Sequence, residues 1–311
     1  MHDPPEPWPQ LTSAQIAPTV EHLHRLVQIA GKYTLDAQFE PGWGHVVYGI
    51  TPRGMATPTL RRNGVTFDVH YRLLDGDVII ESSHGTRTLD LTQRTVAAFY
   101  TEFVSGAAEL DIPAPGTPVA CEIPGATALD ADEEERPWDA QAAQQVWAVL
   151  DSVAGALEAW QASYRGHRPR VGVMWGGFDL SATRYRASTV EPPADRPAFM
   201  QHGMTEEYVA VGFSFGSPEA PEPGVYAYIA PQPDGLERRD WAVEGASWVP
   251  EAGLIVLPWE IVRATPDPHA AVVAFADAVY DAAVATAGWP PELVGPRFDG
   301  WHASRTPLKT A

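Results

Sequence analysis

The chain has 311 residues, of which 45% are hydrophobic and 20% are charged, a composition that predicts a soluble globular protein of one large or two ordinary domains. Lys and Arg number 21 against 40 Asp and Glu, so the formal net charge is −19. This charge argues against a nucleic acid or an anionic membrane as a partner, because both would be repelled. With a single cysteine, Cys121, an internal disulfide and a multi-cysteine metal cluster are excluded. We therefore expect a cytoplasmic protein, with neither a signal peptide nor a membrane span.

A helix is the first element expected. Apolar residues recur on one face at Val20, Leu23 and Val27, and Gly31 is placed to end the helix, just before Lys32. Lysine occurs only at positions 32 and 309, whereas arginine supplies the remaining positive charge. Lys32 therefore draws attention as a candidate functional residue, although a cation at the negative end of a helix is also favourable for stability alone.

The sequence then predicts a strand over residues 43–50, followed by an antiparallel meander and a second helix capped near Thr92. Three pairs mark the turns of the meander: Asn63-Gly64, Asp75-Gly76 and His84-Gly85. Asn-Gly and Asp-Gly are strong hairpin signals, because two-residue hairpin turns need residues that tolerate positive φ.

The second part of the chain predicts the same order of elements. Asp139 caps a helix with apolar residues at steps of three to four, and a last helix begins at Asp267 and Pro268 and ends near Gly288. The strands between these helices are expected at about residues 171–175, 178–184, 207–215, 225–229 and 254–258.

Helix, meander and helix in each half predict an α+β fold of two tandem pseudo-repeats, packed around a pseudo-twofold axis with a cleft between the sheets. Two unrelated α+β units are the alternative. The acidic run at residues 130–135 is expected to be a solvated loop. The expected segments are an N-terminal arm (1–11), a first repeat (12–128), an acidic linker (129–138), a second repeat (139–290) and a C-terminal tail (291–311).

Several well-known chemical motifs are missing or out of context. No glycine-rich phosphate loop or dinucleotide fingerprint is present, so we expect no nucleotide cofactor. Residues 212–216 match Gly-x-Ser-x-Gly, but the proline-rich stretch that follows cannot begin the helix that a nucleophile elbow requires. No histidine pair has metal-ligand spacing, so no metal is expected, although ligands distant in sequence stay an open alternative.

The segment from Met174 to Tyr185 is the most unusual stretch. Strand alternation places Asp179, Ser181 and Thr183 on one face, and the apolar neighbours of Asp179 predict a partly apolar environment for its carboxyl group. Such burial would raise the pKa of Asp179 and suit it to general acid–base catalysis. The alternative is a purely structural ion pair with Arg184.

This segment also carries a family resemblance. Trp175-Gly176-x-Phe178-Asp179-Leu180-x-x-Thr183-Arg184 resembles the signature of a bacterial family of uncharacterised proteins, domain of unknown function 5996. The likeness covers nearly the whole chain, and it implies family membership without implying an activity. The chain departs from the family pattern where a lysine and two histidines are usual. His167, Gly172 and Glu206 stand there instead, so a family activity that needed those residues would be changed or lost.

The favoured hypothesis is an enzyme that acts on a small molecule without a nucleotide or metal cofactor. Asp179 and Glu207 are the expected acid–base groups, and Lys32 and Arg184 would hold an anionic group or developing negative charge. The expected substrate-binding residues are Arg184, Trp175, Trp43, His45, Tyr226 and Tyr228. The alternatives are a binding protein that uses the same cleft without turnover and a structural or interaction protein whose tryptophans serve the core and interfaces.

Overall fold

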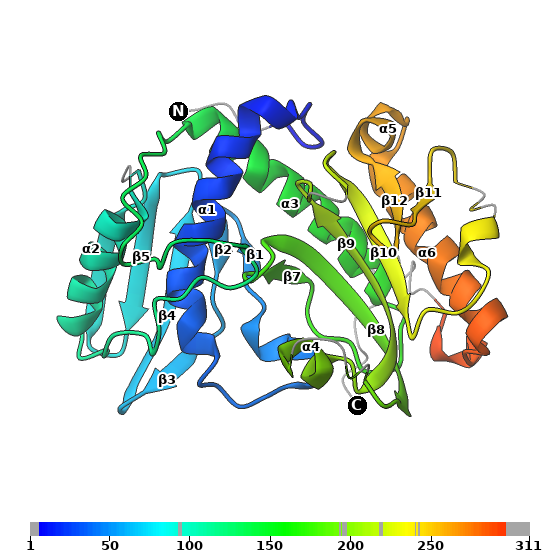
Figure 1. Ribbon diagram of the computed structural model, residues 1–311, viewed down its shortest axis with the longest axis horizontal. Helices are drawn as coiled ribbons and strands as arrows, with labels where there is room; N and C mark the ends of the chain where they lie inside the picture. Colours follow the sequence, from blue (N-terminus) through cyan, green and yellow to red (C-terminus); the bar gives the residue numbers. More distant parts are fainter. Residues whose placement is uncertain are drawn as a thin grey trace, which may run out of the picture.

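Two six-stranded antiparallel sheets, each covered by helices on one face, make up the protein (Figure 1). The computed structural model describes residues 6–92, 95–192, 194, 198–217, 220–239, 241 and 243–296. The prediction of an α+β fold is confirmed. That the two halves are repeats of each other stays a prediction.

The first half holds the sheet with order β1-β2-β4-β5-β6, in which β3 pairs with β4. Alternation in β4 buries Val65, Phe67, Val69 and Tyr71 and leaves the residues between them half-buried. The predicted turns are present, because Asn63 and the glycines at positions 64, 76 and 85 all have positive φ. The elements are α1 (Ser13–Thr34), η1 (Pro41–Val46), β1 (Gly49–Thr51), β2 (Gly54–Ala56), β3 (Leu60–Arg62), β4 (Val65–Arg72), β5 (Asp77–Ser82), β6 (Gly85–Asp90) and α2 (Val96–Ala108).

The second half holds the sheet with order β11-β12-β10-β9-β8-β7. The side chain of Asp139 caps α3 and that of Asp267 caps α6, both as predicted. Its elements are α3 (Ala140–Gln161), β7 (Gly172–Met174), β8 (Asp179–Thr189), α4 (Ala198–Gly203), β9 (Glu206–Ser214), β10 (Gly224–Ala230), η2 (Leu236–Arg238), β11 (Ser247–Val249), β12 (Leu254–Pro258), α5 (Trp259–Ala264), α6 (Pro268–Ala287) and η3 (Pro291–Leu293).

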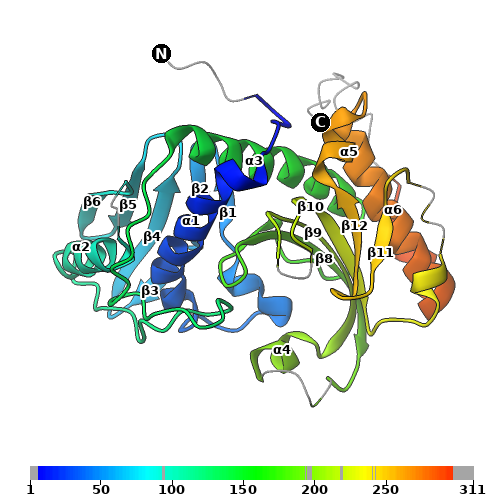
Figure 2. The same cartoon turned by 45° about the horizontal axis from the view of Figure 1, so that its top comes forward.

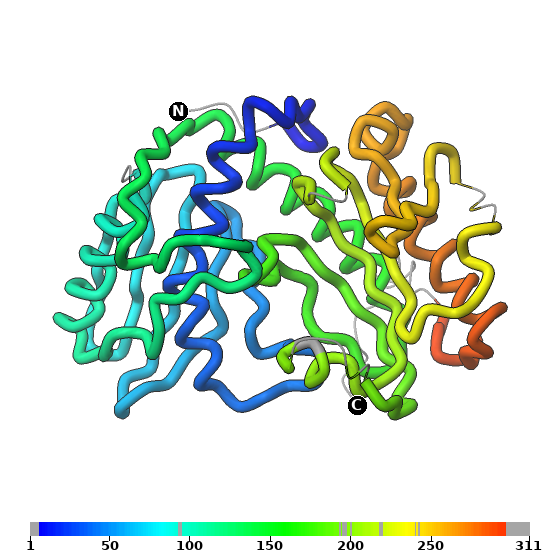
Figure 3. The backbone as a smooth tube through the Cα atoms, in the orientation of Figure 1, coloured from blue at the N-terminus to red at the C-terminus, as the bar shows by residue number. Residues whose placement is uncertain are grey.

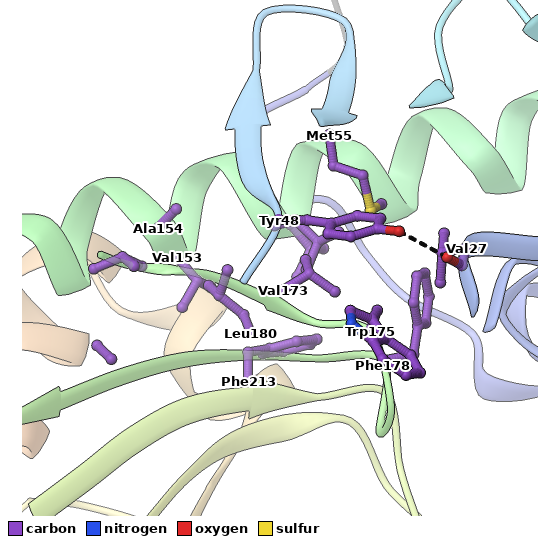
Figure 4. Close-up of a cluster of buried hydrophobic side chains, with 14 of the residues drawn as sticks. Val27, Tyr48, Met55, Val153, Ala154, Val173, Trp175, Phe178, Leu180 and Phe213 are labelled. Carbon is purple, nitrogen blue, oxygen red and sulfur yellow. Dashed lines mark hydrogen bonds between the residues drawn. The ribbon is translucent and has the colours of Figure 1, made fainter. Parts of the chain in front are cut away.

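The two halves share one hydrophobic core. Tyr48 and Val173 form an antiparallel bridge with two backbone hydrogen bonds of 2.9 Å, which joins the segment before β1 to β7. The helix α3 crosses behind both halves and contacts α1, β1, β8 and α6 (Figures 1 and 2). In Figure 4, Tyr48, Val173 and Phe213 lie in one apolar cluster, and the Tyr48 hydroxyl donates to the Val27 carbonyl at 2.8 Å.

The end of α1 differs from the prediction. The helix continues through Gly31 to Thr34, so Lys32 lies inside its last turn rather than after it. Gly31 is a packing residue and not a helix terminator. A Cβ at this position would come within 2.5 Å of the Trp175 ring, so only glycine lets the indole lie against the helix.

The strand predicted over residues 43–50 is mostly wrong. Residues 41–46 form η1, in which Gly42 and Trp43 have φ near +70° and +60°, and the first strand begins only at Gly49. An extended strand cannot contain two successive left-handed residues, so the apolar run here folds as a tight loop that projects Trp43.

The acidic run before α3 is not wholly solvated, as had been expected. Asp132 is buried and pairs with Arg136, with an N–O distance of 3.1 Å, and with Arg25 at 3.3 Å. One carboxylate of the run thus ties the linker to α1. The tube view in Figure 3 shows the chain that follows α2 and leads through this linker into α3.

The start of the described chain packs against the second half. Trp8 stacks on Trp259 with ring centroids 5.6 Å apart, and Trp259 Nε1 donates to the Pro9 carbonyl at 2.9 Å. This contact between the N-terminal residues and α5 contributes to the shared core.

One helix among the described residues, α6, is long and apolar enough to cross a membrane by length and composition alone. Within the qualifying window, 44% of the residues are buried inside the protein, and the helix packs on α3, β9 and β10. A core helix of a globular protein passes the same test, so this is weak evidence for a span.

Candidate functional site

A cavity of about 190 Å³ opens on the face of the second sheet that points away from α3 and α6. Strands β8, β9 and β10 form its floor, while η1 of the first half and α4 lie across it (Figure 2). Six of its sixteen lining residues are aromatic. The lining residues are Gly42, Trp43, Val47, Pro169, Arg170, Met174, Asp179, Ser181, Thr183, Tyr185, Phe199, Gly203, Met204, Tyr208, Tyr226 and Tyr228.

Strand alternation decides which residues reach this cavity. On β8, Asp179, Ser181 and Thr183 line it as predicted, whereas Leu180 and Ala182 are buried on the helix-covered face. The same rule brings Tyr208 of β9 and Tyr226 and Tyr228 of β10 to the cavity floor. The polar groups thus lie along β8, which ends this row with Tyr185, and tyrosine rings come from β9 and β10 beside it.

The bend before β8 positions Asp179. Phe178 has φ of +53°, and its backbone N–H donates to the Met174 carbonyl at 2.8 Å, which closes the turn. From α1, His24 Nε2 lies 2.6 Å from the Gly176 carbonyl, and Gln28 donates to the same oxygen at 3.4 Å. Helix α1 therefore holds the bend that places Asp179 at the start of its strand.

Asp179 has the perturbed acidity that the sequence predicted. Desolvation by burial raises its pKa to about 7, and the nearby charge of Glu122 acts in the same direction. The Tyr226 hydroxyl donates a hydrogen bond to the carboxylate, which opposes this rise. The predicted pair with Arg184 does not form.

Glu122 is a neighbour that the sequence analysis missed. Its φ is +56°, and a Cβ on Gly176 would come within 2.1 Å of its Oε1, so the carboxylate packs against the glycine bend beside Asp179. Desolvation raises the pKa of Glu122, and the charge of Lys32 opposes that rise. The sequence carries no periodic signal for this contact, because the residue lies in an irregular segment.

Aromatic rings form the walls. Tyr226 and Tyr228 stack with centroids 6.3 Å apart, and Tyr208 meets Tyr228 nearly at a right angle of 79°. Trp43 Nε1 donates to the Phe199 carbonyl at 2.9 Å, which links η1 to α4 across the cavity. The prediction placed Trp43, Tyr226 and Tyr228 in a common site, and all three line the cavity.

Two other predicted residues lie in the core beneath the bend and do not line the cavity. Lys32 is only 2% exposed, its Nζ lies 3.0 Å from Cys121 Sγ, and it sits 5.0 Å from the centre of the Trp175 ring. Trp175 is buried and donates from Nε1 to Thr34 Oγ1 at 3.1 Å.

Glu207 and Arg184 lie on the opposite face of the sheet from Asp179. Glu207 pairs with Arg186 at 2.6 Å. The buried Arg184 guanidinium lies between the rings of Trp160, Tyr164 and Tyr280 at 3.9–5.1 Å and donates to the Trp160 carbonyl. Neither residue lines the cavity, so a joint acid–base role for Asp179 and Glu207 does not fit the geometry.

Arg170, which sequence reasoning missed, is the basic residue among the described lining residues. Its guanidinium donates to the Val47 carbonyl, and partial burial lowers its pKa, opposed by the charge of Glu40. The predicted residue His45 stacks on Trp43 at 5.4 Å but does not itself line the cavity. Its Nδ1 accepts a hydrogen bond from the Glu40 backbone, and burial lowers its pKa.

Potential metal ligands gather elsewhere. On the outer face of the first sheet, one ligand atom each from Asp68, His70 and Glu81 lies within 4.8 Å of the others. His70 Nε2 already contacts Asp68 at 2.9 Å, and none of the three residues lines the cavity.

Comparison with known proteins gives a family and nothing more specific. The model of a family of unknown function, DUF5996, matches residues 8–295, nearly the whole chain. No curated protein and no solved structure matches the chain. The family carries no described activity, so the chemistry has to be argued from the cavity itself. The chain belongs to the DUF5996 family.

Proposed function

We propose that the protein is a small-molecule enzyme, independent of nucleotide cofactors, in which Asp179 transfers a proton to or from the substrate. The observation that carries the proposal is a half-buried carboxyl group in the wall of a cavity with aromatic walls, with a pKa of about 7. An acid–base group works best when its pKa lies near the working pH, because both protonation states are then populated.

The surroundings of Asp179 support this role. Tyr226 donates to one carboxylate oxygen and fixes the orientation of the group, while the aromatic walls offer apolar surface to a substrate. The cavity of about 190 Å³ is smaller than the ~300–1,000 Å³ typical of drug-sized ligands, so the substrate is a small molecule. The net charge of −19 and the single cysteine support a cytoplasmic location without a nucleic acid partner.

A binding protein without turnover is the second candidate. It is favoured by the position of Glu207 and Lys32 outside the cavity, which leaves Asp179 as the one acid–base carboxyl among the described lining residues. A reaction that needs a separate acid and base would lack one partner there.

Incubation with the small-molecule fraction of a bacterial extract separates these functions. Mass spectrometry of the extract is expected to show compounds consumed and formed by the wild type and by Glu207→Gln, but not by Asp179→Asn. Compounds that are retained by the protein but unchanged in amount overall would support the binding protein instead. An extract that is neither altered nor depleted by the wild type would contradict both functions.

A further inference from the structure

Three polar residues on one face of α1 contact the segments that pack on it. His24, Gln28 and Lys32 follow one another at a spacing of four, which places them on the same side of the helix. Gln28 is buried and holds both backbone groups of Cys121, since it donates to the carbonyl at 2.8 Å and accepts from the N–H at 2.7 Å. On the next turn, Lys32 Nζ lies 3.0 Å from Cys121 Sγ. Helix α1 therefore fixes the backbone of Cys121 with one side chain and contacts its sulfur with the next.

The ammonium group of Lys32 has an unusual partner. Lys32 is buried, and among the described residues the sulfur of Cys121 is the one hydrogen-bond acceptor of its Nζ. A thiol sulfur accepts hydrogen bonds weakly, and the Trp175 ring, 5.0 Å away, adds only a cation–π contact. A buried cation that serves stability alone is normally paired with a carboxylate and hydrogen-bonded throughout. The contact therefore indicates a chemical role for this nitrogen and this sulfur.

The residue types at this contact point to covalent chemistry. The chain has one cysteine and two lysines, at positions 32 and 309, whereas arginine fills its other basic positions. A guanidinium group would supply the same positive charge, but it keeps its proton and does not act as a nucleophile as an amine does. The fold thus holds the chain's one thiol against one of its two side-chain amines.

The pair lies between the core and the solvent. Cys121 is half-buried, so a small oxidant can approach it from outside, whereas Lys32 belongs to the core. A separation of 3.0 Å between nitrogen and sulfur lies within the ~3–3.5 Å at which two atoms are placed to react. Neither residue lines the cavity of Asp179, so this pair is independent of the proposed function.

We propose that Cys121 and Lys32 form a modification site, at which hydrogen peroxide links the two side chains through a sulfur–nitrogen bond. In the first step the sulfur attacks one peroxide oxygen. An S–O bond forms, the O–O bond breaks, and the leaving hydroxide takes up the thiol proton as water. The sulfur is oxidised by two electrons to the sulfenic acid, and the peroxide is reduced.

The second step closes the link. The Lys32 amine, after its ammonium proton has passed to the solvent, attacks the sulfur of the sulfenic acid. The S–N bond forms, the S–O bond breaks, and the hydroxyl group leaves as water with one proton of the amine. Each link therefore consumes one hydrogen peroxide and releases two waters and one proton.

A protease that cleaves after lysine detects the link. The wild-type protein is treated with a small molar excess of hydrogen peroxide, denatured without reductant and digested. Because lysine occurs only at positions 32 and 309, the untreated chain is cut after Lys32 and releases residues 1–32. The oxidised protein is expected to lose this cut, since the protease does not recognise a lysine joined to sulfur, and to regain it after treatment with dithiothreitol.

The intact mass supplies a second readout. The linked protein is expected to be a monomer lighter by two hydrogen atoms than the untreated one. An unchanged mass, or a gain of oxygen with the cut after Lys32 preserved, would overturn the proposal. A loss of two hydrogen atoms with that cut preserved would place the bond on a backbone nitrogen and would overturn it as well.

Two variants separate the two partners. Lys32→Arg keeps the positive charge without the amine, so oxidation is expected to stop at the sulfenic acid, which dimedone captures as it forms. Cys121→Ser keeps the amine without the thiol, is expected to keep the cut after Lys32, and measures the background oxidation of the five methionines. A loss of two hydrogen atoms in Lys32→Arg would mean that the sulfur has another partner and would contradict the proposal. Loss and recovery of the cut are measured on the wild type, so they decide the question even if the arginine variant does not fold.

Discussion

At the residue scale, the ionised carboxylate of Asp179 lowers the free energy of unfolding of the protein without ligand. This carboxyl group is partly withdrawn from water, it has no ion pair with a described basic residue, and its hydrogen bond from Tyr226 compensates only in part. Burial of this kind favours the protonated form, which is why the pKa rises to about 7 instead of falling. A carboxyl group whose pKa is raised by desolvation in this way is typical of a functional site rather than of a structural one.

A stability measurement tests this cost. Since the folded-state pKa of about 7 lies above the unfolded value near ~3.9, the contribution of Asp179 to stability is fully present below about pH 4 and is lost as the pH rises to about 7. Replacement by asparagine removes this loss while keeping an oxygen that accepts from Tyr226. Asp179→Asn is therefore expected to gain stability over the wild type between pH 4 and pH 8, by up to about 4 kcal/mol.

Urea denaturation of both proteins at several pH values measures the difference. Contributions of carboxyl groups far from Asp179 cancel in the comparison, whereas Glu122 is coupled to Asp179, so the measured difference belongs to this pair. A difference in the free energy of unfolding that does not change with pH would mean that Asp179 titrates alike in the folded and unfolded chains.

At the element scale, the packing of α1 on the Trp175 ring depends on a glycine. Gly31→Ala would place a Cβ about 2.5 Å from the indole, so we expect a loss of roughly 1–3 kcal/mol in the free energy of unfolding. Gly155→Ala is the matched control in α3. Nothing lies within 4 Å of its Cβ, so it should be stabilised by up to ~1 kcal/mol through helix propensity alone.

Thermal or urea unfolding of the two alanine variants checks this contrast. If Gly31→Ala proves as stable as Gly155→Ala, the close contact between α1 and the bend before β8 is not as the structure has it.

Much of the element pattern could be predicted from local signals. Asn63-Gly64 and Asp75-Gly76 mark true hairpins, and the caps at Asp139 and Asp267 begin true helices. The errors fell where tertiary contacts override local preference. Gly31 looks like a helix terminator until the Trp175 ring is placed against it, and a sequence does not show that contact.

The functional site could be predicted only in part, because tertiary contacts also decide which residues reach it. Alternation correctly placed Asp179 and Ser181 on one face of β8. Applied strictly, alternation would also have put Arg184 on the other face, since five positions separate it from Asp179. No local rule places Arg170 or Glu122, because each reaches the site from an irregular segment that only the folded chain brings there.

At the scale of the whole molecule, one core extends through both halves. The bridge between Tyr48 and Val173 and the helix α3 leave no independent core for either half. The protein is therefore expected to unfold in a single cooperative transition, with the same urea midpoint by tryptophan fluorescence and by far-ultraviolet circular dichroism. Two separated transitions would show that the halves fold independently.

The cavity depends on the packing of the two halves against each other, because η1 belongs to the first half and β8–β10 to the second. The central feature of the cavity is the raised pKa of the Asp179 carboxyl group, about 7. Carbon-13 NMR of the Asp179 carboxyl, assigned by comparison with Asp179→Asn, measures that acidity directly. The titration midpoint is predicted to be about 7 in the free protein. A midpoint near the ordinary aspartate value of ~3.9 would contradict the acid–base role of Asp179.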